Sequence, residues 1–470
     1  MGFFRFRRSI PLGRFLRINV SKTGASLSAG KPGATINVNR DGVDGTVGVP
    51  GSGMSYKQRL AGRGGCVSLL ALGCLLGGLA GCASDERALP EGPTFAEDVD
   101  LLREHADAVV LEAPSGARVL VAPRYQGRVM TSAFDADEPG NGWVNRAAVA
   151  DPTVRPHINV YGGEERLWLG PEGGQFGLFF APGAPFTFER WQTPALLDTL
   201  PWPVTRRTET SVSLAVDGEL VNRAGTRLRL RLDRTVRILA SPAEVAGALG
   251  ARLPEGVEAV GYVTDNGITN TGDAPWVRET GVPSIWLLGM LRHGERARIV
   301  VPVRPGPDTA LGPRVNDAYF GKIAADRLAV RENFVVLRAD GRSRGKIGVG
   351  PRRARDTLGA WNPETGVLTV VRFTRDPAAT EYVNSSWSEQ REPLGGDVAN
   401  AYNDGPPAPG AAPLGPFFEL ESSSPALPLV AGQRATHRQA TVHLRGDRGA
   451  LDTLARSLLG AGLDEIEGAL

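Results

Sequence analysis

The most constraining feature of this 470-residue sequence is a strict two-residue alternation near its middle. Within residues 226–232, leucines at 228, 230 and 232 alternate with arginines at 227, 229 and 231. An extended strand separates such a pattern onto two faces, because successive side chains point in opposite directions. Strand patterns recur at 211–216, 257–264, 297–303, 367–373 and 436–444. The main domain, residues 94–448, is therefore predicted to be all-β, a large antiparallel β-sandwich.

A few short helices are expected beside the strands. Thr94 and Glu97 form a capping-box pattern at the start of one helix, and Ser241 precedes a proline at the start of another. Residues 449–470, rich in Ala and Leu, predict a C-terminal helix outside the sandwich. The Pro-rich stretch 404–416 predicts a long ordered loop.

All three cysteines of the chain lie in one apolar segment, residues 61–82. A hydrophobic run of this length is typical of a signal peptide or of a membrane-spanning helix. The segment ends in Leu-Ala-Gly-Cys, which resembles the bacterial lipobox, so Cys82 is the predicted lipidation site. The alternative is a plain transmembrane anchor, and translation from Met54 rather than Met1 would give the lipoprotein signal an ordinary length. Residues 83–93 are the expected linker to the main domain.

Charge is distributed unevenly along the chain. Residues 1–63 carry eleven Lys or Arg against two Asp, a net +9, whereas the remaining 407 residues carry 42 basic and 49 acidic side chains, a net −7. A basic leader before an apolar segment predicts that the main domain lies outside the cytoplasm. We therefore expect membrane attachment through a lipid anchor or a transmembrane helix, and a cell-envelope location, periplasmic or as an outer-membrane lipoprotein. Nucleic acid is not an expected partner, because the main domain is mildly acidic.

Residues 1–60 predict a small, basic, Gly-rich β domain, with short alternating runs separated by turns. The stretches 2–9, 16–24 and 48–56 resemble a small bacterial domain family of unknown function. This resemblance implies neither a ligand nor a reaction, so the role of the domain stays open.

The main domain carries a further resemblance. Four runs, 157–175, 316–321, 401–406 and 417–425, resemble a family of bacterial envelope proteins without an assigned function. That family resembles the galactose-mutarotase-like (aldose 1-epimerase) supersandwich, and residues 119–123 look like the opening of an epimerase. The resemblance implies a supersandwich fold and a carbohydrate ligand. Indole rings near turns that could stack on a sugar are those of Trp143, Trp168, Trp191 and Trp387.

The resemblance also implies acid–base chemistry, in which a His acts as general acid and a Glu as general base at the anomeric centre. His157 is the candidate acid, and Glu419 and Glu421, which a strand places on one face, are the candidate bases. The candidate substrate-binding residues are Glu164, Arg166, Trp168, Asn403 and Asp404. The alternatives are a structural role for His157 and a salt bridge between the Glu pair and an arginine. Because the epimerase His motif and its second histidine are not reproduced, whether the protein is an enzyme stays open.

No organic cofactor is expected, and Ca²⁺ is the metal for which oxygen ligands could gather. Those ligands would be Asp397, Asn403, Asp404 and Glu419, near the Pro-rich loop. His437 and His443 share one face of a strand but are too far apart to share a metal, and we expect that face to be solvated.

The sequence thus predicts a membrane-anchored envelope protein that binds carbohydrate, with mutarotase-like sugar processing as a hypothesis. The alternative is a non-catalytic lipoprotein that binds glycan or protein.

Overall fold

The computed structural model describes residues 92–408 and 410–470 in full, together with the backbone of six strands between residues 7 and 62. The chain divides into two units, residues 1–87 and residues 88–470. Met54, Cys82 and most of the apolar segment lie outside the described residues, as does the linker up to residue 91. Within the described part of the chain, no helix is both long enough and apolar enough to cross a membrane.

The first unit contains six antiparallel strands. They are β1 (Arg7–Pro11), β2 (Leu16–Ser21), β3 (Gly24–Lys31), β4 (Ala34–Asn39), β5 (Gly42–Gly48) and β6 (Ser55–Gly62). Because each strand pairs with the one that follows it in the chain, the sheet is a meander.

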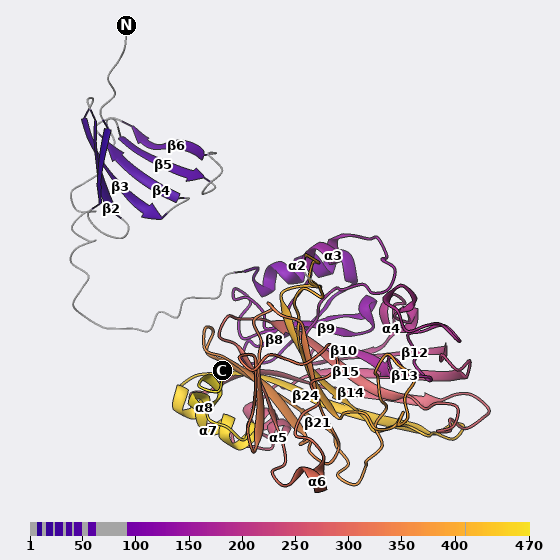
Figure 1. Ribbon diagram of the computed structural model, residues 1–470. Helices are drawn as coiled ribbons and strands as arrows, with labels where there is room; N and C mark the ends of the chain where they lie inside the picture. The colour runs from indigo at the N-terminus through magenta and orange to yellow at the C-terminus, as the bar shows by residue number, and fades with distance from the viewer. Residues whose placement is uncertain are drawn as a thin grey trace. The chain divides into compact units, whose positions relative to one another are not determined.

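The second unit is built from two large antiparallel sheets and one small sheet (Figure 1). The ten-stranded sheet has the order β11 (Val204–Arg207), β12 (Ser211–Val221), β13 (Arg227–Ile238), β14 (Glu258–Asn270), β24 (Arg434–Arg445), β21 (Val367–Phe373), β20 (Thr357–Asn362), β16 (Arg298–Pro302), β18 (Phe334–Arg338) and β17 (Leu328–Val330). The five-stranded sheet has the order β10 (Arg166–Gly170), β15 (Ser284–Arg292), β23 (Phe417–Ser423), β22 (Ala399–Asn403) and β19 (Gly345–Val349). The small sheet consists of β7 (Val109–Glu112), β8 (Arg118–Ala122) and β9 (Arg128–Ala133). The predicted antiparallel, mostly β fold is confirmed.

The alternating segment at residues 226–232 lies in β13 and its flank, within the ten-stranded sheet. Leu228, Leu230 and Leu232 are at most 1% exposed, while the arginines between them are at least partly exposed. These leucines share one core with Leu167 of β10, so the two large sheets pack face to face. Each fully buried leucine stabilises this core by roughly 1.5–3 kcal/mol.

Short helices accompany the sheets. They are α2 (Phe95–Ala106), α3 (Arg146–Ala150), α4 (Ala195–Asp198), α5 (Pro242–Leu249), α6 (Asp308–Leu311), α7 (Arg448–Leu459) and α8 (Leu463–Glu467), with the 3-10 helices η1 (Pro123–Tyr125) and η2 (Phe188–Arg190). Helices α5, α7 and α8 pack on the outward face of the ten-stranded sheet, where Leu249, Leu454 and Ile466 join a core cluster with Val370 and Val442. The predicted C-terminal helix is therefore two helices, α7 and α8, that cover this sheet.

Helix α2 begins with the predicted capping box. The Glu97 backbone N–H donates to the Thr94 hydroxyl over 3.2 Å, and the Thr94 N–H donates to the Glu97 carboxylate over 3.0 Å. We expect Thr94→Ala to lower the free energy of unfolding by about 1 kcal/mol, because a helix N–H loses its partner. Urea denaturation followed by circular dichroism measures the change, with Thr94→Ser as the control that keeps a hydroxyl. Equal stability of Thr94→Ala and the wild type would contradict the assigned cap.

Polar side chains are buried between the two large sheets. His443 Nε2 lies 2.5 Å from a Glu164 carboxylate oxygen, and His443 Nδ1 lies 2.8 Å from the Thr369 hydroxyl. His437 Nε2 lies 2.8 Å from the Ser422 hydroxyl. Both histidines are 1% exposed, so the expected solvated face is wrong. The face that they share points into the sandwich, where these hydrogen bonds replace those to water.

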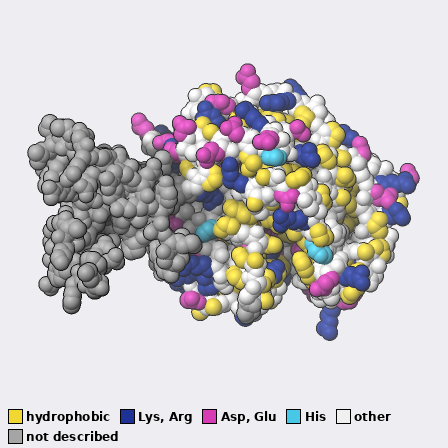
Figure 2. Space-filling model, turned by 90° about the horizontal axis from the view of Figure 1, so that it is seen from above, with side chains coloured by type: hydrophobic (Ala, Val, Ile, Leu, Met, Phe, Trp, Pro, Cys, Tyr) yellow, Lys and Arg dark blue, Asp and Glu magenta, His cyan; other side chains and the backbone are white. Residues whose placement is uncertain are grey.

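The face of the second unit that Figure 2 presents mixes charges of both signs. Figure 2 shows basic and acidic side chains interspersed over the face that it presents, with apolar side chains between them. Exposed ion pairs of this unit include Arg278 with Glu381. A surface of this kind lacks the continuous field of one sign that steers a highly charged partner over long distances.

Candidate functional site

The outward face of the five-stranded sheet carries a cluster of charged and aromatic side chains, which we call the sheet-face site. Its defining residues are Arg166, Trp168, Glu172, Trp286, Lys346, Glu419 and Glu421. Side chains alternate along a strand, so residues on the opposite face, such as Leu167 and Ile347, pack into the core. The pairing register places Glu419 of β23 beside Tyr402 of β22, and Tyr402 beside Lys346 of β19.

Two buried ion pairs form the centre of this site. Arg166 Nη2 donates to Glu419 Oε1 over 3.0 Å, and Lys346 Nζ donates to Glu421 Oε2 over 2.8 Å. Trp286 Nε1 donates to the same Glu421 oxygen over 2.9 Å. Arg166, Glu419 and Glu421 are each at most 6% exposed. Charges at this depth need such partners, because their removal from water costs several kcal/mol per ion.

Indole rings lie against both cations. The Arg166 guanidinium lies 4.4 Å from the centre of the Trp168 ring, and Lys346 Nζ lies 4.9 Å from the centre of the Trp286 ring. The two rings meet edge to face, with centroids 5.6 Å apart. Cation–π attraction is strongest for Trp, so these contacts help to hold the two cationic groups in place.

Glu172 links the buried centre to an aromatic rim. Its Oε1 accepts hydrogen bonds from Trp191 Nε1 and from Trp387 Nε1, each over 3.0 Å. The two indoles stack with centroids 5.9 Å apart, and Phe188 stacks on Trp191 at 6.1 Å. Phe188 is 56% exposed and Trp387 is 37% exposed, and Trp191 lines a groove of about 410 Å³. The rim therefore presents flat apolar surfaces to solvent beside a carboxylate of the site.

Burial changes the proton affinities of the ionisable groups. It raises the pKa of Glu419 to about 7; Arg166 opposes this rise, and the neighbouring Glu421 charge adds to it. Burial also raises the pKa of Glu172, against the effect of Lys346. For Lys346, burial alone would lower the pKa, but the Glu421 and Glu172 charges outweigh it and raise the pKa. Glu419 can therefore both give and accept a proton near neutral pH, as a general acid or base must.

Three polar atoms of this face are buried and lack a hydrogen-bond partner among the described residues. They are Arg166 Nε, Trp168 Nε1 and Glu421 Oε1. A buried donor or acceptor left unpaired costs about 1–3 kcal/mol. The register sets Arg166 opposite Leu288 and Leu288 opposite Glu421, so the three atoms lie on one face of the sheet, on the strands β10 and β23 that flank β15. Two donors and one acceptor in this arrangement fit a ligand that carries hydroxyl groups.

Comparison with protein families assigns the part of the chain that holds this site. Residues 93–470 match the Family of unknown function (DUF6786). The chain belongs to this family. Residues 4–57 match a second family, described as Protein of unknown function (DUF4236). Every residue of the sheet-face site lies within the DUF6786 match.

No curated protein matches this DUF6786 chain. Among solved structures, it is similar to a galactose mutarotase-like protein from Lactobacillus casei ATCC 334, with 12% identity and a TM-score of 0.41 over 72% of this chain and 100% of that one. It is also similar to a galactose mutarotase related enzyme from Lactobacillus acidophilus, with 9% identity and a TM-score of 0.39 over 72% of this chain and 97% of that one.

Four of the residues predicted from the sequence meet in the sheet-face site. They are Arg166, Trp168, Glu419 and Glu421. Glu164 does not join them, because it lies between the sheets, where its carboxylate accepts hydrogen bonds from the Ser132 N–H over 2.6 Å and from the Ser132 hydroxyl over 2.8 Å. Glu164 is therefore not part of the sheet-face site, and its binding role stays a prediction.

His157 lies at the aromatic rim. Its Nδ1 is 2.6 Å from the Trp191 carbonyl oxygen, and its ring tilts against Phe188 with centroids 4.8 Å apart. Its backbone has φ of 72°, in the left-handed region that non-glycine residues adopt mainly in turns. Within the described residues, the hydrogen bonds of His157 reach the loop around Trp191 rather than the carboxylates of the site. These contacts correspond to the structural alternative for His157.

Asn403 and Asp404 fix the start of the Pro-rich loop. The Asp404 carboxylate accepts hydrogen bonds from the Tyr402 hydroxyl over 2.5 Å and from the Gly415 N–H over 2.8 Å. The Asn403 side chain accepts one from the Gly341 N–H over 3.0 Å. In the part of the chain that the structure describes, no group of three or more His, Cys, Asp or Glu side chains is placed to hold a metal ion. The expected oxygen ligands for Ca²⁺ bond protein donors instead.

Sequence reasoning missed three residues of the site, namely Glu172, Trp286 and Lys346. Lys346 follows a stretch rich in Gly and Arg, residues 341–345, whose composition is typical of a turn, but β19 begins at Gly345 and includes Lys346. A signal was present, because Lys346 is one of only five lysines in the chain and precedes an alternating Ile347 and Val349. Trp286 offered no comparable signal, since a tryptophan within a strand is most often a core residue.

Proposed function

We propose that the sheet-face site binds a carbohydrate, and that Glu419 and Glu421 perform acid–base chemistry on it. The observation that supports this most directly is the set of unpaired atoms on one buried face, Arg166 Nε, Trp168 Nε1 and Glu421 Oε1. A sugar has hydroxyl groups that donate and accept hydrogen bonds, and apolar C–H faces that pack on indole rings. The site offers both kinds of contact in one cluster.

In this proposal Glu421 acts as the base. Lys346 and Trp286 hold its Oε2, so Oε1 is the oxygen that accepts the proton of the anomeric hydroxyl. Glu419, whose pKa is raised by burial to about 7, gives its proton to the ring oxygen as the ring C–O bond breaks and the carbonyl forms. Reversal of both transfers closes the ring with either anomeric configuration. Protons and electron pairs balance without a further reactant.

A second candidate function is glycan binding without turnover. The position of His157 supports it, because this candidate acid bonds the Trp191 carbonyl at the rim. Two loops beside the buried carboxylates also support it, because they are joined by a hydrogen bond of 3.1 Å from the Glu172 N–H to the Ser385 hydroxyl. A binding protein needs the rim and the unpaired polar atoms but no acid–base pair. Polarimetry on a sugar that binds distinguishes turnover from binding alone.

The lipid anchor at Cys82 and the envelope location belong to the same proposal, and the sequence motif alone supports them. Mass spectrometry of the mature N-terminus tests both. A diacylglyceryl-modified Cys82 as the first residue is the expected result, and an unprocessed chain that keeps Met1 would contradict the lipoprotein assignment.

The binding proposal is tested by thermal unfolding of the full-length chain with a panel of neutral mono- and oligosaccharides. A ligand that binds only the folded state stabilises it by about 2.7 kcal/mol at a concentration of 100 Kd. We expect at least one sugar class to raise the unfolding midpoint of the wild type, and Glu421→Gln and Trp168→Phe to lose that rise. Glu381→Gln, which changes an exposed carboxylate paired with Arg278, is the matched control. No rise with any sugar, or the same rise in Glu421→Gln as in the wild type, contradicts the proposal.

A further inference from the structure

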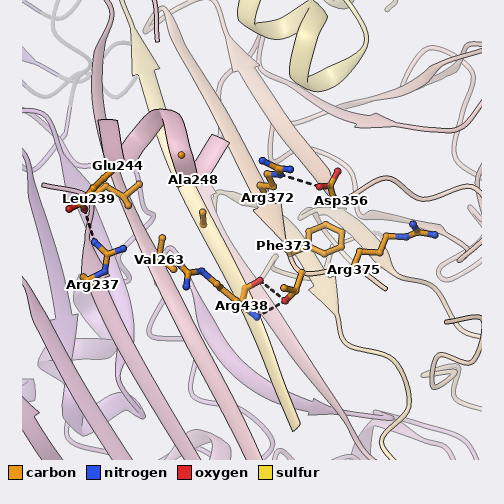
Figure 3. Close-up of a pocket in the computed structure, with 13 residues that line it drawn as sticks. Arg237, Leu239, Glu244, Ala248, Val263, Asp356, Arg372, Phe373, Arg375 and Arg438 are labelled. Carbon is orange, nitrogen blue, oxygen red and sulfur yellow. Dashed lines mark hydrogen bonds and ion pairs between the residues drawn. The ribbon is translucent and has the colours of Figure 1, made fainter. Parts of the chain in front are cut away.

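A second feature lies on the outward face of the other large sheet, the ten-stranded one. There, helix α5 and strands β13, β14, β24 and β21 border a groove of about 570 Å³ (Figure 3). Leu239, Val263 and Ala440 contribute apolar lining and belong to the core cluster that α5 covers. Cavities that hold small organic ligands measure roughly 300–1,000 Å³, so this groove has the size for an organic molecule rather than for a simple inorganic ion.

The groove is rich in arginine. Its four arginines are Arg237, Arg372, Arg375 and Arg438. The acidic side chains in the same lining are Glu244 and Asp356, and Asp265 outside the lining pairs with Arg438, so these seven side chains carry a net charge of +1. Figure 3 shows Arg237 and Arg438 on one side of the groove and Arg372 on the other, while Arg375 extends away from them. The charge and the apolar lining together favour an anion with an organic body.

The arginines on one side of the groove keep donors available. Arg237 Nη1 bonds Glu244 over 2.6 Å, and Arg438 Nη1 bonds Asp265, which lies outside the lining, over 3.4 Å. The side chains of both pairs are between 38% and 52% exposed, and ion pairs at such exposure contribute only about 0–1 kcal/mol. A guanidinium carries five N–H donors in a planar fork, so each arginine can bind a further anion.

We propose that this groove binds an organic anion, a molecule with one phosphate or carboxylate group on a small apolar body. The guanidinium groups of Arg237 and Arg438 bind the anionic group through charge-assisted hydrogen bonds. Ala248, the partly exposed apolar residue of the lining, contacts the apolar body between the arginines of the two sides. The proposal is independent of the carbohydrate proposal, because the groove and the sheet-face site lie on the outward faces of different sheets.

Binding of octyl phosphate to the full-length chain tests this proposal, by isothermal titration calorimetry below the micelle concentration. We expect saturable binding at least tenfold tighter than that of inorganic phosphate, which lacks the apolar body. Octyltrimethylammonium, which has the same alkyl chain and the opposite charge, should not bind saturably. Arg237→Gln combined with Arg438→Gln should weaken octyl phosphate binding at least tenfold.

Arg231→Gln is the matched control. Arg231 lies on the same outward face of β13 and bonds Asp217 over 2.7 Å, but it is not part of the groove lining. Its exchange should leave the affinity unchanged. Undiminished binding by the double Gln variant, an equal loss in Arg231→Gln, or no saturable binding of octyl phosphate would each overturn the proposal. Equally tight binding of inorganic phosphate would overturn the contribution assigned to the apolar lining.

Discussion

We expect Arg234→Met to lower the free energy of unfolding by about 3–5 kcal/mol at neutral pH. Arg234 is fully buried, and its Nη2 donates to Glu165 Oε1 over 2.8 Å. Its Nη1 donates to Asn266 Oδ1 over 2.5 Å, and its Nε donates to the Gly127 carbonyl over 3.0 Å. Methionine fills a similar volume but removes all three hydrogen bonds and leaves the Glu165 charge in the core without its counter-charge. Urea denaturation of both proteins measures the loss.

Two comparisons separate the charge effect from packing. Burial raises the pKa of Glu165, and Arg234 opposes that rise. Without Arg234 the pKa rises further, so the stability lost in Arg234→Met should shrink as the pH falls and the carboxyl takes up its proton. Adding Glu165→Gln to Arg234→Met should likewise recover much of the loss at neutral pH.

An exposed ion pair provides the control for Arg234. Arg278 bonds Glu381 over 2.6 Å, and both side chains are about half exposed. Arg278→Met should therefore cost less than about 1 kcal/mol, because water solvates the remaining carboxylate. If Arg234→Met lowered the free energy of unfolding no more than Arg278→Met does, the buried Arg234–Glu165 pair would not contribute strongly to the stability of the sandwich.

Features that depend on residues within one element could be predicted from the sequence. The leucines at 228, 230 and 232 face the core because a strand alternates its side chains. Thr94 caps α2 because its hydroxyl lies three residues before Glu97. Glu419 and Glu421 share one face of β23 for the same reason as the leucines. Period and capping are local properties, so one sequence is enough to predict them.

The rest of the site depends on which elements become neighbours. Arg166 and Glu419 are 253 residues apart in the chain, and only the strand order of the five-stranded sheet brings them into contact. His437 and His443 share a face, as their spacing predicts, but spacing does not say which face is covered. Strand β24 lies in the interior of its sheet, and that face of β24 turns toward the other large sheet. Burial of the two histidines is therefore a tertiary property.

Lowering the pH from 6.5 to 4 should destabilise the wild type by about 3 kcal/mol more than it destabilises His437→Gln. Burial lowers the pKa of His437 from 6.5 to about 3, so between these values the unfolded chain binds a proton that the folded chain does not. The stability linked to neutral His437 is therefore fully present above pH 6.5 and falls by about 1.4 kcal/mol per pH unit below it. Glutamine removes this titration and keeps a polar partner for the Ser422 hydroxyl.

Urea unfolding at pH 7.5, 6.5, 5 and 4 measures this difference. The other ionisable groups are common to both proteins, so their contributions cancel in the comparison. His105→Gln is the control, because it replaces a histidine that is 30% exposed at the end of α2 rather than a buried one. If the free energies of unfolding of the wild type and His437→Gln change with pH in parallel, His437 takes up a proton within the folded protein. If the free energy of unfolding of His437→Gln instead depends less on pH than that of the wild type, the buried polar side chains between the two large sheets exclude a charge at position 437. The sandwich is then sensitive to acid.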